Sequence, residues 1–346
     1  MKKIVFLGNS LAAVKAIEEI RRGDQESRLT IVSKNQDWPC RRNLFVPYLA
    51  KELKEFDVLA QPADFYKKNN VQLLFDKKIA RIDFKKNRLM TEEKENIEFD
   101  VLVITDVQIA RFPDIKGIQK TNVFGFRSWG DIKAIGDLLP IIETVAVEGS
   151  DLSSLLLVCA FKKRQREVIW VVPDHQICPQ TLSSEQAQAI GKLLEGKGVH
   201  LIPGTSIKEI LGDVEAKAVR LPSGKVLAAQ AVIFTQPKSD FRLLQNGPLT
   251  LGRAIAVNDQ LKTNLENIFA VDDVCELFSS PECDAYEFQT THVPEQGRVV
   301  GLNILGQTTS YIAPARHLTI PIFDVTLILN ADYCQIVENQ PATQGH

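Results

Sequence analysis

The N-terminal segment, residues 3–32, combines short apolar runs with a helical pattern. Residues 3–7 are continuously apolar after Lys3, and they are followed by Gly8-Asn9-Ser10 and by apolar residues at helical spacing up to Ile20. A second apolar run, residues 29–32, follows at the distance that a right-handed crossover between parallel strands requires. This order predicts strand, tight turn, helix and strand, the outline of a mononucleotide-binding unit.

The same order occurs a second time in the middle of the chain. Residues 144–150 resemble the first strand and turn, an apolar helix is expected over 152–161, and a strand over 168–172. Such self-similarity indicates an internal duplication of the strand–helix–strand unit. Polar turns between short strand-like runs predict a small antiparallel meander beside each copy, around residues 80–90 and 218–225.

Length and charge narrow the class of protein. A chain of 346 residues exceeds what one hydrophobic core usually supports, which favours two domains. Its 45% hydrophobic and 24% charged residues are ordinary globular values, and a formal net charge of -2 gives no electrostatic case for nucleic acid or an acidic membrane. Bulk charge therefore does not select a partner.

The cysteines and the apolar runs bear on compartment and on metals. The six cysteines contain no C-x-x-C pair, so neither a dithiol redox motif nor a zinc ribbon is expected, and isolated thiols suit a reducing compartment. The apolar run after Lys3 is too short for a signal peptide, and no run approaches the roughly 18 apolar residues of a membrane span. We expect a cytoplasmic protein with no membrane segment and no metal site.

The first glycine turn resembles a family motif. Pyridine nucleotide-disulfide oxidoreductases carry G-x-G-x-x-G/A at this place, and here the motif positions are Gly8, Ser10 and Ala13. The middle glycine lets backbone approach a pyrophosphate at the helix N-terminus, and serine is small enough to stand there. The chain resembles most the nitrite-reductase, rubredoxin-reductase and NADH-oxidase-like branch of that superfamily, over roughly residues 3 to 325.

Three further segments carry the same resemblance. Residues 267–274 are similar to the family's second FAD signature, in which Asp273 matches the ribityl-binding aspartate and Asp272 replaces a glycine. Residues 292–298, with Pro294, resemble the helix whose start meets the flavin pyrimidine ring. Residues 39–44 resemble a loop beside the cofactor, with Arg42 at its arginine position. The resemblance thus implies FAD bound by Gly8, Ser10, Ala13, Arg42, Asp273 and Pro294.

The family also implies the architecture. We expect an α/β fold of two Rossmann-like domains, each with three layers in the order ββα, the NAD(P)-like domain being inserted in the FAD-binding domain. Residues 1–110 and 246–330 would form the FAD-binding domain and residues 111–245 the NAD(P)-like domain. A short tail, residues 331–346, would replace the C-terminal interface domain that the family normally has, which leaves the oligomeric state open.

Other positions depart from the family pattern. Lys34 stands where the family places the carboxylate that binds the adenosine ribose, and a lysine cannot accept those hydroxyl protons. Asp106 and Asp272 add carboxylates near a diphosphate. In the second turn Glu148, Ser150 and Ser153 are expected at the three glycine positions, and Glu148 would repel the phosphates of NAD(P)H.

Redox side chains of the family are not found. Asn43 rather than Cys40 aligns with the redox cysteine, and Pro47 with a lysine near the flavin. The basic run 162–166 is interpreted as a solvated helix end rather than a 2′-phosphate or partner site. His292 is interpreted as structural rather than catalytic, and neither a disulfide nor a metal role is expected for Cys275 and Cys283.

The sequence therefore predicts an FAD-dependent oxidoreductase or electron-transfer flavoprotein. It would have an impaired NAD(P)H site, no assigned catalytic side chain and, as partner, a protein electron donor or acceptor. The alternative is a pseudoenzyme that keeps the reductase scaffold as an interaction or assembly subunit, since a fold alone does not establish activity.

Overall fold

The structure is a computed structural model that divides into two compact units. The first unit comprises Met1–Leu44, Lys54–Arg111 and Lys238–Ala313, and the second Phe45–Leu53, Phe112–Pro237 and Pro314–His346. The described residues are 1–36, 38–61, 64–105, 112–235, 241–245, 247–252, 254–277, 292–313, 317–330 and 334–339. The second unit thus interrupts the first along the chain, as an inserted domain does.

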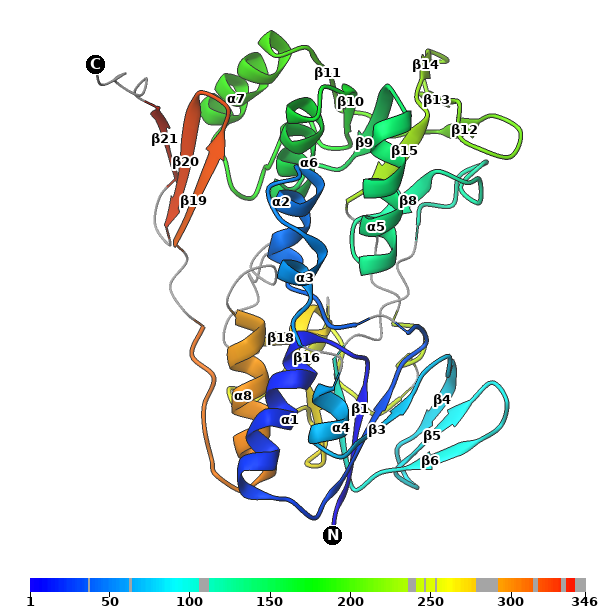
Figure 1. The fold of residues 1–346 in the computed structure, drawn as a ribbon, viewed down its shortest axis with the longest axis vertical. Helices are drawn as coiled ribbons and strands as arrows, with labels where there is room; N and C mark the ends of the chain where they lie inside the picture. Colours follow the sequence, from blue (N-terminus) through cyan, green and yellow to red (C-terminus); the bar gives the residue numbers. More distant parts are fainter. Residues whose placement is uncertain are drawn as a thin grey trace. The chain divides into compact units, whose positions relative to one another are not determined.

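A five-stranded parallel sheet forms the centre of the first unit (Figure 1). The strands follow the order β17-β7-β1-β2-β3, with bounds Ile268–Ala270, Val101–Ile104, Lys3–Leu7, Arg28–Val32 and Val71–Leu74. Strand β1 is buried along Ile4–Leu7, which accounts for the continuous apolar run in the sequence. Helix α1 (Leu11–Gly23) crosses from β1 to β2, and its apolar side faces the core.

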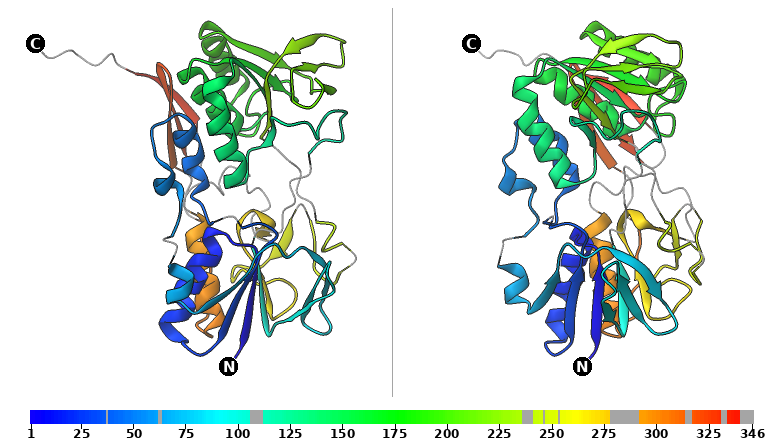
Figure 2. Two further views of the ribbon diagram at one scale, coloured as in Figure 1. Left: turned by 45° about the vertical axis from the view of Figure 1, so that its right-hand side comes forward. Right: turned by 90° about the vertical axis from the view of Figure 1, so that its right-hand side faces the viewer.

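Two layers cover this sheet. Figure 2 shows the sheet between α1 and α8 (His292–Ile304) on one side and an antiparallel meander on the other. The meander strands are β4 (Ile79–Asp83), β5 (Arg88–Thr91) and β6 (Asn96–Glu98). The remaining elements are β16 (Ile255–Val257) paired with β18 (Cys275–Leu277), α3 (Glu55–Val58), α4 (Phe65–Lys68), η1 (Arg42–Leu44) and η3 (Asp272–Val274).

The second unit repeats this plan. Its parallel sheet follows the order β11-β10-β9-β15-β8, with bounds Val199–Pro203, Glu167–Val172, Thr144–Glu148, Ala231–Phe234 and Val123–Gly125. Helix α6 (Leu152–Lys163) follows β9 as α1 follows β1, and α7 (Ser184–Gly196) precedes β11. One face of the sheet packs on the meander β12 (Glu209–Leu211), β13 (Ala218–Arg220) and β14 (Val226–Ala228) through Val171, Val219 and Phe234.

Further elements complete the second unit. Helix α2 (Phe45–Leu49) packs on α5 (Trp129–Leu138) and α6, with the Tyr48 and Trp129 rings 4.9 Å apart. The turn η2 (Leu139–Ile141) follows α5. A three-stranded antiparallel sheet contains β19 (His317–Ile322), β20 (Val325–Asn330) and β21 (Cys334–Glu338). No helix among the described residues is both long and apolar enough to cross a membrane.

The α/β fold with two Rossmann-like units, the duplication and both meanders are confirmed. The compact units differ from the expected domain boundaries at several segments: 45–53 and 314–346 group with the second unit, whereas 111 and 238–245 group with the first. Residues 334–338 form a strand where the sequence suggested only a tail, and Gln186 Nε2 donates to the Cys334 carbonyl at 2.7 Å. These assignments depend on contacts between residues far apart along the chain, which local patterns do not contain.

Candidate cofactor site

The loop between β1 and α1 has the geometry of a phosphate-binding turn. Gly8 directly follows β1 with φ +107°, a conformation that disfavours residues with a Cβ, and its N–H donates to the Val32 carbonyl at 2.9 Å. Ser10 is the N-cap of α1, and its hydroxyl accepts from the Ala13 N–H at 3.4 Å. The predicted residues Gly8, Ser10 and Ala13 thus stand at the turn, the helix start and the first helical turn.

Helix α8 lies directly against α1. Gly297 faces the Ala12 carbonyl and Gly301 faces Ala16, and in both cases a Cβ would overlap backbone atoms. The start of α8, which contains Pro294, is therefore held beside the start of α1. Two helix N-termini, each carrying partial positive charge, lie at the same end of the first unit.

A buried ionic group joins two of the predicted cofactor residues. The Arg42 guanidinium lies 2.9 Å from Asp273 Oδ2 and 3.9 Å from Asp272 Oδ1, and all three side chains are largely buried. Asp272 Oδ1 accepts from the Asp273 N–H at 2.9 Å, and the Asp272 N–H donates to Gln296 Oε1 on α8 at 2.6 Å. The turn after β17 is thereby tied to both the Arg42 loop and α8.

Asp272 keeps the backbone conformation that its family glycine would provide. Its φ is +67°, in the left-handed region, where aspartate is among the better tolerated residues. The replacement therefore preserves the turn that presents Asp273. The added carboxylate is held by a backbone N–H and lies beside Arg42, so it does not face the site as an isolated charge.

The predicted residues come together because their strands are parallel. Gly8 follows β1, Thr105 follows β7 and Val271 follows β17, so all three loops leave the same edge of the sheet. Ligands of open α/β sheets bind at this carboxyl edge. Of the six predicted cofactor residues, Arg42 and Asp273 form an ion pair, and the other four lie on the adjoining turn and helices.

Sequence reasoning missed one residue that supports the turn. The Tyr66 hydroxyl on α4 donates to Asn9 Oδ1 at 2.7 Å, and burial raises the pKa of Tyr66 while this hydrogen bond opposes the shift. The Trp38 and Tyr66 rings lie 5.7 Å apart. Only a long-range contact brings Tyr66 to the turn, so no local pattern in the sequence could have shown it.

The structure shows where some of the other positions that depart from the family pattern lie. Lys34 is exposed two residues beyond the end of β2. Asp106 and Cys283 lie outside the described residues. Cys40 donates to the Trp38 carbonyl at 3.1 Å, and the buried His292 has its Nδ1 2.8 Å from the Tyr311 hydroxyl, contacts that agree with structural roles.

The basic run 162–166 is bonded within the second unit. Arg164 donates to the Leu49 carbonyl at 2.8 Å, and Lys163 pairs with Glu52 at the same distance. These contacts fasten α2 to the end of α6. The run lies at the end of a helix, as the sequence suggested, but Arg164 and Lys163 are bonded to residues 49 and 52 rather than only solvated.

The second glycine turn begins one residue later than the sequence predicted. Glu148 belongs to β9 and pairs in register with Val171 and Phe234. It is Gly149 whose N–H donates to the Val171 carbonyl at 3.1 Å, as Gly8 donates to Val32. The assignment of Glu148, Ser150 and Ser153 to the glycine positions was therefore wrong, because β9 extends one residue further than its apolar run.

In the corrected register Gly149, Asp151 and Ser154 match Gly8, Ser10 and Ala13. Asp151 is the N-cap of α6, and its Oδ1 accepts from the Ser154 N–H at 3.1 Å. Glu148 instead takes the place of Leu7. It accepts from the Ile207 N–H at 2.5 Å, and burial raises the pKa of Glu148 to about 7 against the lowering effect of that hydrogen bond.

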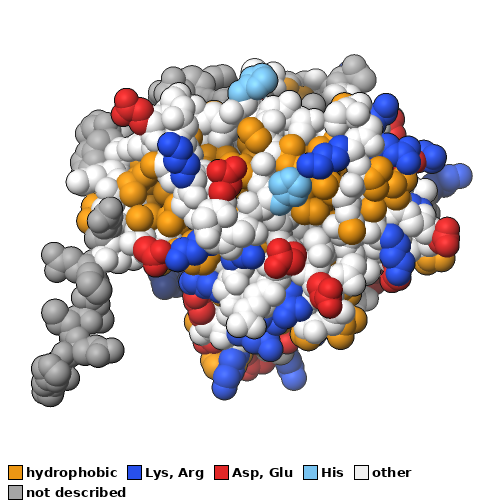
Figure 3. All heavy atoms as spheres, turned by 90° about the horizontal axis from the view of Figure 1, so that it is seen from above, with side chains coloured by type: hydrophobic (Ala, Val, Ile, Leu, Met, Phe, Trp, Pro, Cys, Tyr) orange, Lys and Arg blue, Asp and Glu red, His pale blue; other side chains and the backbone are white. Residues whose placement is uncertain are grey.

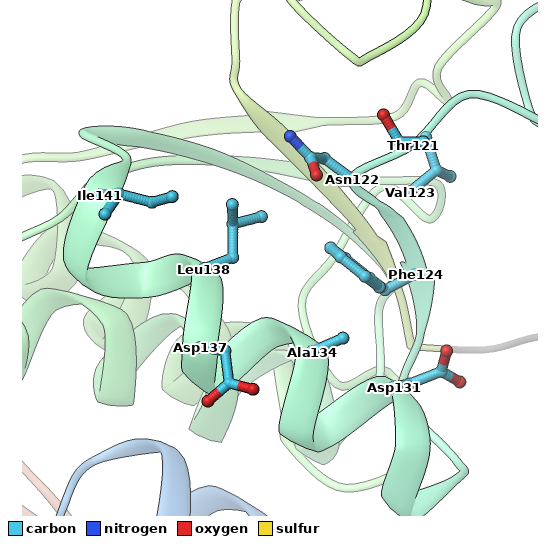
Figure 4. A pocket seen from close by; sticks show the side chains of 9 residues that line it. All are labelled: Thr121, Asn122, Val123, Phe124, Asp131, Ala134, Asp137, Leu138 and Ile141. Atoms are coloured by element: carbon cyan, nitrogen blue, oxygen red, sulfur yellow. The ribbon is translucent and has the colours of Figure 1, made fainter.

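A groove of about 590 Å³ lies elsewhere on the second unit, between β8 and α5 (Figure 4). Phe124, Leu138 and Ile141 point into it, whereas the Asp131 and Asp137 carboxylates point away. The residues that line this groove include no pair of side chains suited to acid–base or nucleophilic catalysis. On the face drawn in Figure 3, basic and acidic side chains are interspersed. In the described part of the chain no three His, Cys, Asp or Glu residues gather as a metal site.

The geometry of the first unit agrees with a family match along the chain. Residues 2–296 match the family model described as pyridine nucleotide-disulphide oxidoreductase. The chain belongs to this family. Its members are oxidoreductases with two dinucleotide-binding domains, which agrees with the duplicated fold.

Relatives within the family include reductases and oxidases. The chain is 27% identical over 323 residues to an NADH oxidase of Methanocaldococcus jannaschii, covering 88% of this chain and 70% of that protein. It is 23% identical over 277 residues to the assimilatory nitrate reductase electron transfer subunit of Bacillus subtilis, covering 80% of this chain. That alignment spans only 36% of the Bacillus protein, so the family member is considerably longer than the part matched here.

Solved structures share the fold. The covalent putidaredoxin reductase–putidaredoxin complex matches with a TM-score of 0.83 at 18% identity, covering 95% of this chain and 81% of that chain. The water-forming NADH oxidase from Lactobacillus brevis bound to NADH matches with a TM-score of 0.83 at 16% identity, covering 95% and 75%. These likenesses show the two-domain architecture.

Proposed function

We propose that this protein is an FAD-dependent oxidoreductase that transfers electrons to or from a protein partner, with FAD held in the first unit. The observation that carries the proposal is the meeting of Arg42 and Asp273, 2.9 Å apart, at the sheet edge where the Gly8–Ser10 turn and α8 begin. These groups come from four separate segments of the first unit. A hydrophobic core does not require polar groups from four segments to converge at the edge of the sheet, whereas a binding site for a polar cofactor does.

The residues of the first unit fit FAD. The Gly8–Ser10 turn and the N-terminus of α1 would hold the pyrophosphate, since Gly8 keeps the required backbone and Ser10 is neutral and small. Asp273 would accept hydrogen bonds from the ribityl hydroxyls, with Arg42 holding its carboxylate. The start of α8 at Pro294 would face the pyrimidine end. When bound, the flavin supplies the one- and two-electron chemistry, and the protein supplies binding and orientation.

The partner and the electron donor are part of the same proposal. Two relatives are named as an electron transfer subunit and as a reductase in complex with putidaredoxin, which supports a protein as donor or acceptor. We further propose that NAD(P)H binds weakly in the second unit, whose turn carries a carboxylate at the middle glycine position. A cytoplasmic location also remains a prediction.

The absorbance spectrum of the purified protein tests the proposal. We expect flavin bands and the release of FAD on denaturation. Asp273→Ala should lower FAD occupancy much more than Cys40→Ser, because the Cys40 thiol donates to the Trp38 carbonyl within its own loop. Colourless protein that also fails to take up added FAD would favour the pseudoenzyme alternative. Equal occupancy in the two variants would show that Asp273 is not the ribityl ligand.

A further inference from the structure

The loop between β9 and α6 has the backbone of a dinucleotide-binding turn, but Asp151 places a carboxylate where the family has its middle glycine. Thr235, which follows β15, donates its N–H to the Glu148 carbonyl at 3.0 Å, and Thr105 donates to Leu7 in the same way in the first unit. These bonds, together with those of Gly8 and Gly149, align the two turns residue by residue. Asp151 therefore stands where the first unit has Ser10.

The Asp151 carboxylate occupies the start of α6. Its Oδ1 accepts two hydrogen bonds, from the Ser154 N–H at 3.1 Å and from the Thr235 hydroxyl at 2.8 Å. Thr235 is itself buried, so its hydroxyl is committed inside the turn. A pyrophosphate bound in the family's manner would need the same N-terminal N–H groups and the same space.

We infer that Asp151 is a built-in substitute for the dinucleotide phosphate, which closes the second unit to NAD(P)H in the pose that its fold provides. This inference deepens the proposed function, because it identifies the residue that would keep the nicotinamide donor out of the second unit. Two effects act together: the carboxylate repels a like-charged phosphate, and it already accepts the helix-start N–H that a phosphate would need.

Glu148 does not have this role. Its side chain leaves the end of β9 toward the Ile207 N–H, and its counterpart in the first unit is Leu7, a strand residue. The adenosine end of the second unit, in contrast, keeps a family feature. Asp174 is exposed two residues beyond β10, and a carboxylate shortly after this strand binds the adenosine ribose in dinucleotide domains. In the register set by Gly8 and Gly149 it lies one residue beyond the counterpart of Lys34.

The test is to replace Asp151 with the residue that the first unit uses. Asp151→Ser keeps an N-cap hydroxyl for α6, so the helix should still form. ADP-ribose is the probe because it carries the pyrophosphate and both riboses but cannot reduce a flavin. We titrate ADP-ribose calorimetrically into the parent protein, Asp151→Ser and Glu148→Gln. Each protein is first saturated with FAD, so that the affinities compared are those of the second unit. Thermal unfolding checks that both variants are folded.

We expect no binding by the parent up to millimolar ADP-ribose, at least a tenfold gain in affinity for Asp151→Ser, and no gain for Glu148→Gln. Micromolar binding by the parent would overturn the inference. A folded Asp151→Ser variant without a gain, or an equal gain for Glu148→Gln, would also overturn it. FAD content is read from absorbance on the same samples, so a failure of the proposed flavin site would be seen separately, and the difference between variant and parent would still report on Asp151.

Discussion

The two strand–turn–helix copies of this chain share a backbone and differ in the groups that stand on it. At the start of the helix the first copy has Ser10 and the second has Asp151; at the end of the strand the first has Leu7 and the second has Glu148. At the helix start, where a phosphate would bind, the first copy is thus neutral and the second carries a carboxylate. A duplicated fold can therefore keep its turn geometry while the side chains at the helix start differ.

The helices of the two copies, α1 and α6, also pack against different neighbouring helices. In the first unit α1 packs along α8 through Gly297 and Gly301, which lets the two helix starts lie side by side. In the second unit α6 packs against α2, held by Arg164 and Lys163 at the far end of the helix. Helix α1 thus contacts another helix through glycines near its start, whereas the polar contacts of α6 with the α2 segment lie at its C-terminal end.

The largest effect should come from filling the α1–α8 contact. Gly297→Ala places a Cβ against the Ala12 carbonyl, and backbone cannot move aside as a flexible side chain can. We expect a loss of about 3 kcal/mol in the free energy of unfolding of the first unit, together with lower FAD occupancy. The control is Gly196→Ala at the end of α7, where a Cβ would meet nothing within 4 Å and should have little effect. Chemical denaturation measures both, and equal stability would refute the close contact.

The next effect transfers the acidic residue of the second turn to the first. Ser10→Asp should weaken FAD binding by roughly 2 kcal/mol, or about 30-fold, because a carboxylate would then face the pyrophosphate. Ser10→Asn is the matched control, since asparagine caps a helix equally well without the charge. Fluorescence titration of the apoprotein with FAD gives the affinities. If the Asp and Asn variants bind FAD equally, charge at the helix start does not distinguish the two copies.

The smallest effect concerns the end of β9. Because burial raises the pKa of Glu148 from 4.5 to about 7, the folded protein holds this proton more tightly than the unfolded chain does. Its contribution to stability is therefore fully present below about pH 4.5 and is lost as the pH rises through about 7. At pH 8 Glu148→Gln removes a buried charge but also replaces the hydrogen bond from Ile207 to a carboxylate with a weaker one to an amide. The net effect should be a stabilisation on the order of 1 kcal/mol at pH 8 and almost none at pH 4.

Denaturation curves of the parent and Glu148→Gln over pH 4 to 8 measure this difference. A gap between the two that is independent of pH would show that Glu148 does not titrate in this range. The homologous strand end at Leu7 carries no titratable group, so the first unit should contribute no such pH dependence from this position.

The duplication could be predicted because it depends on local order, whereas the kind of cofactor site was implied by the resemblance to the family. Apolar runs of strand length, a small-residue turn and a helical pattern follow one another within about thirty residues. The four cofactor segments could also be named, and the pairing of Arg42 with Asp273 agrees with that assignment. What failed was the register of the second turn, because Glu148 ends a buried strand and a charged residue there looks like the start of a loop.

By itself, the sequence determined the α/β class, the repeated unit and the residues around the first turn, since each depends on neighbouring positions, whereas the inserted arrangement was implied by the resemblance to the family. Only the tertiary structure decided that Glu148 belongs to the β9 ladder, that Tyr66 supports Asn9, and that residues 45–53 and β19–β21 group with the second unit. The physical reason is that strand pairing and hydrogen bonds between distant segments select one register among several that local hydrophobicity allows.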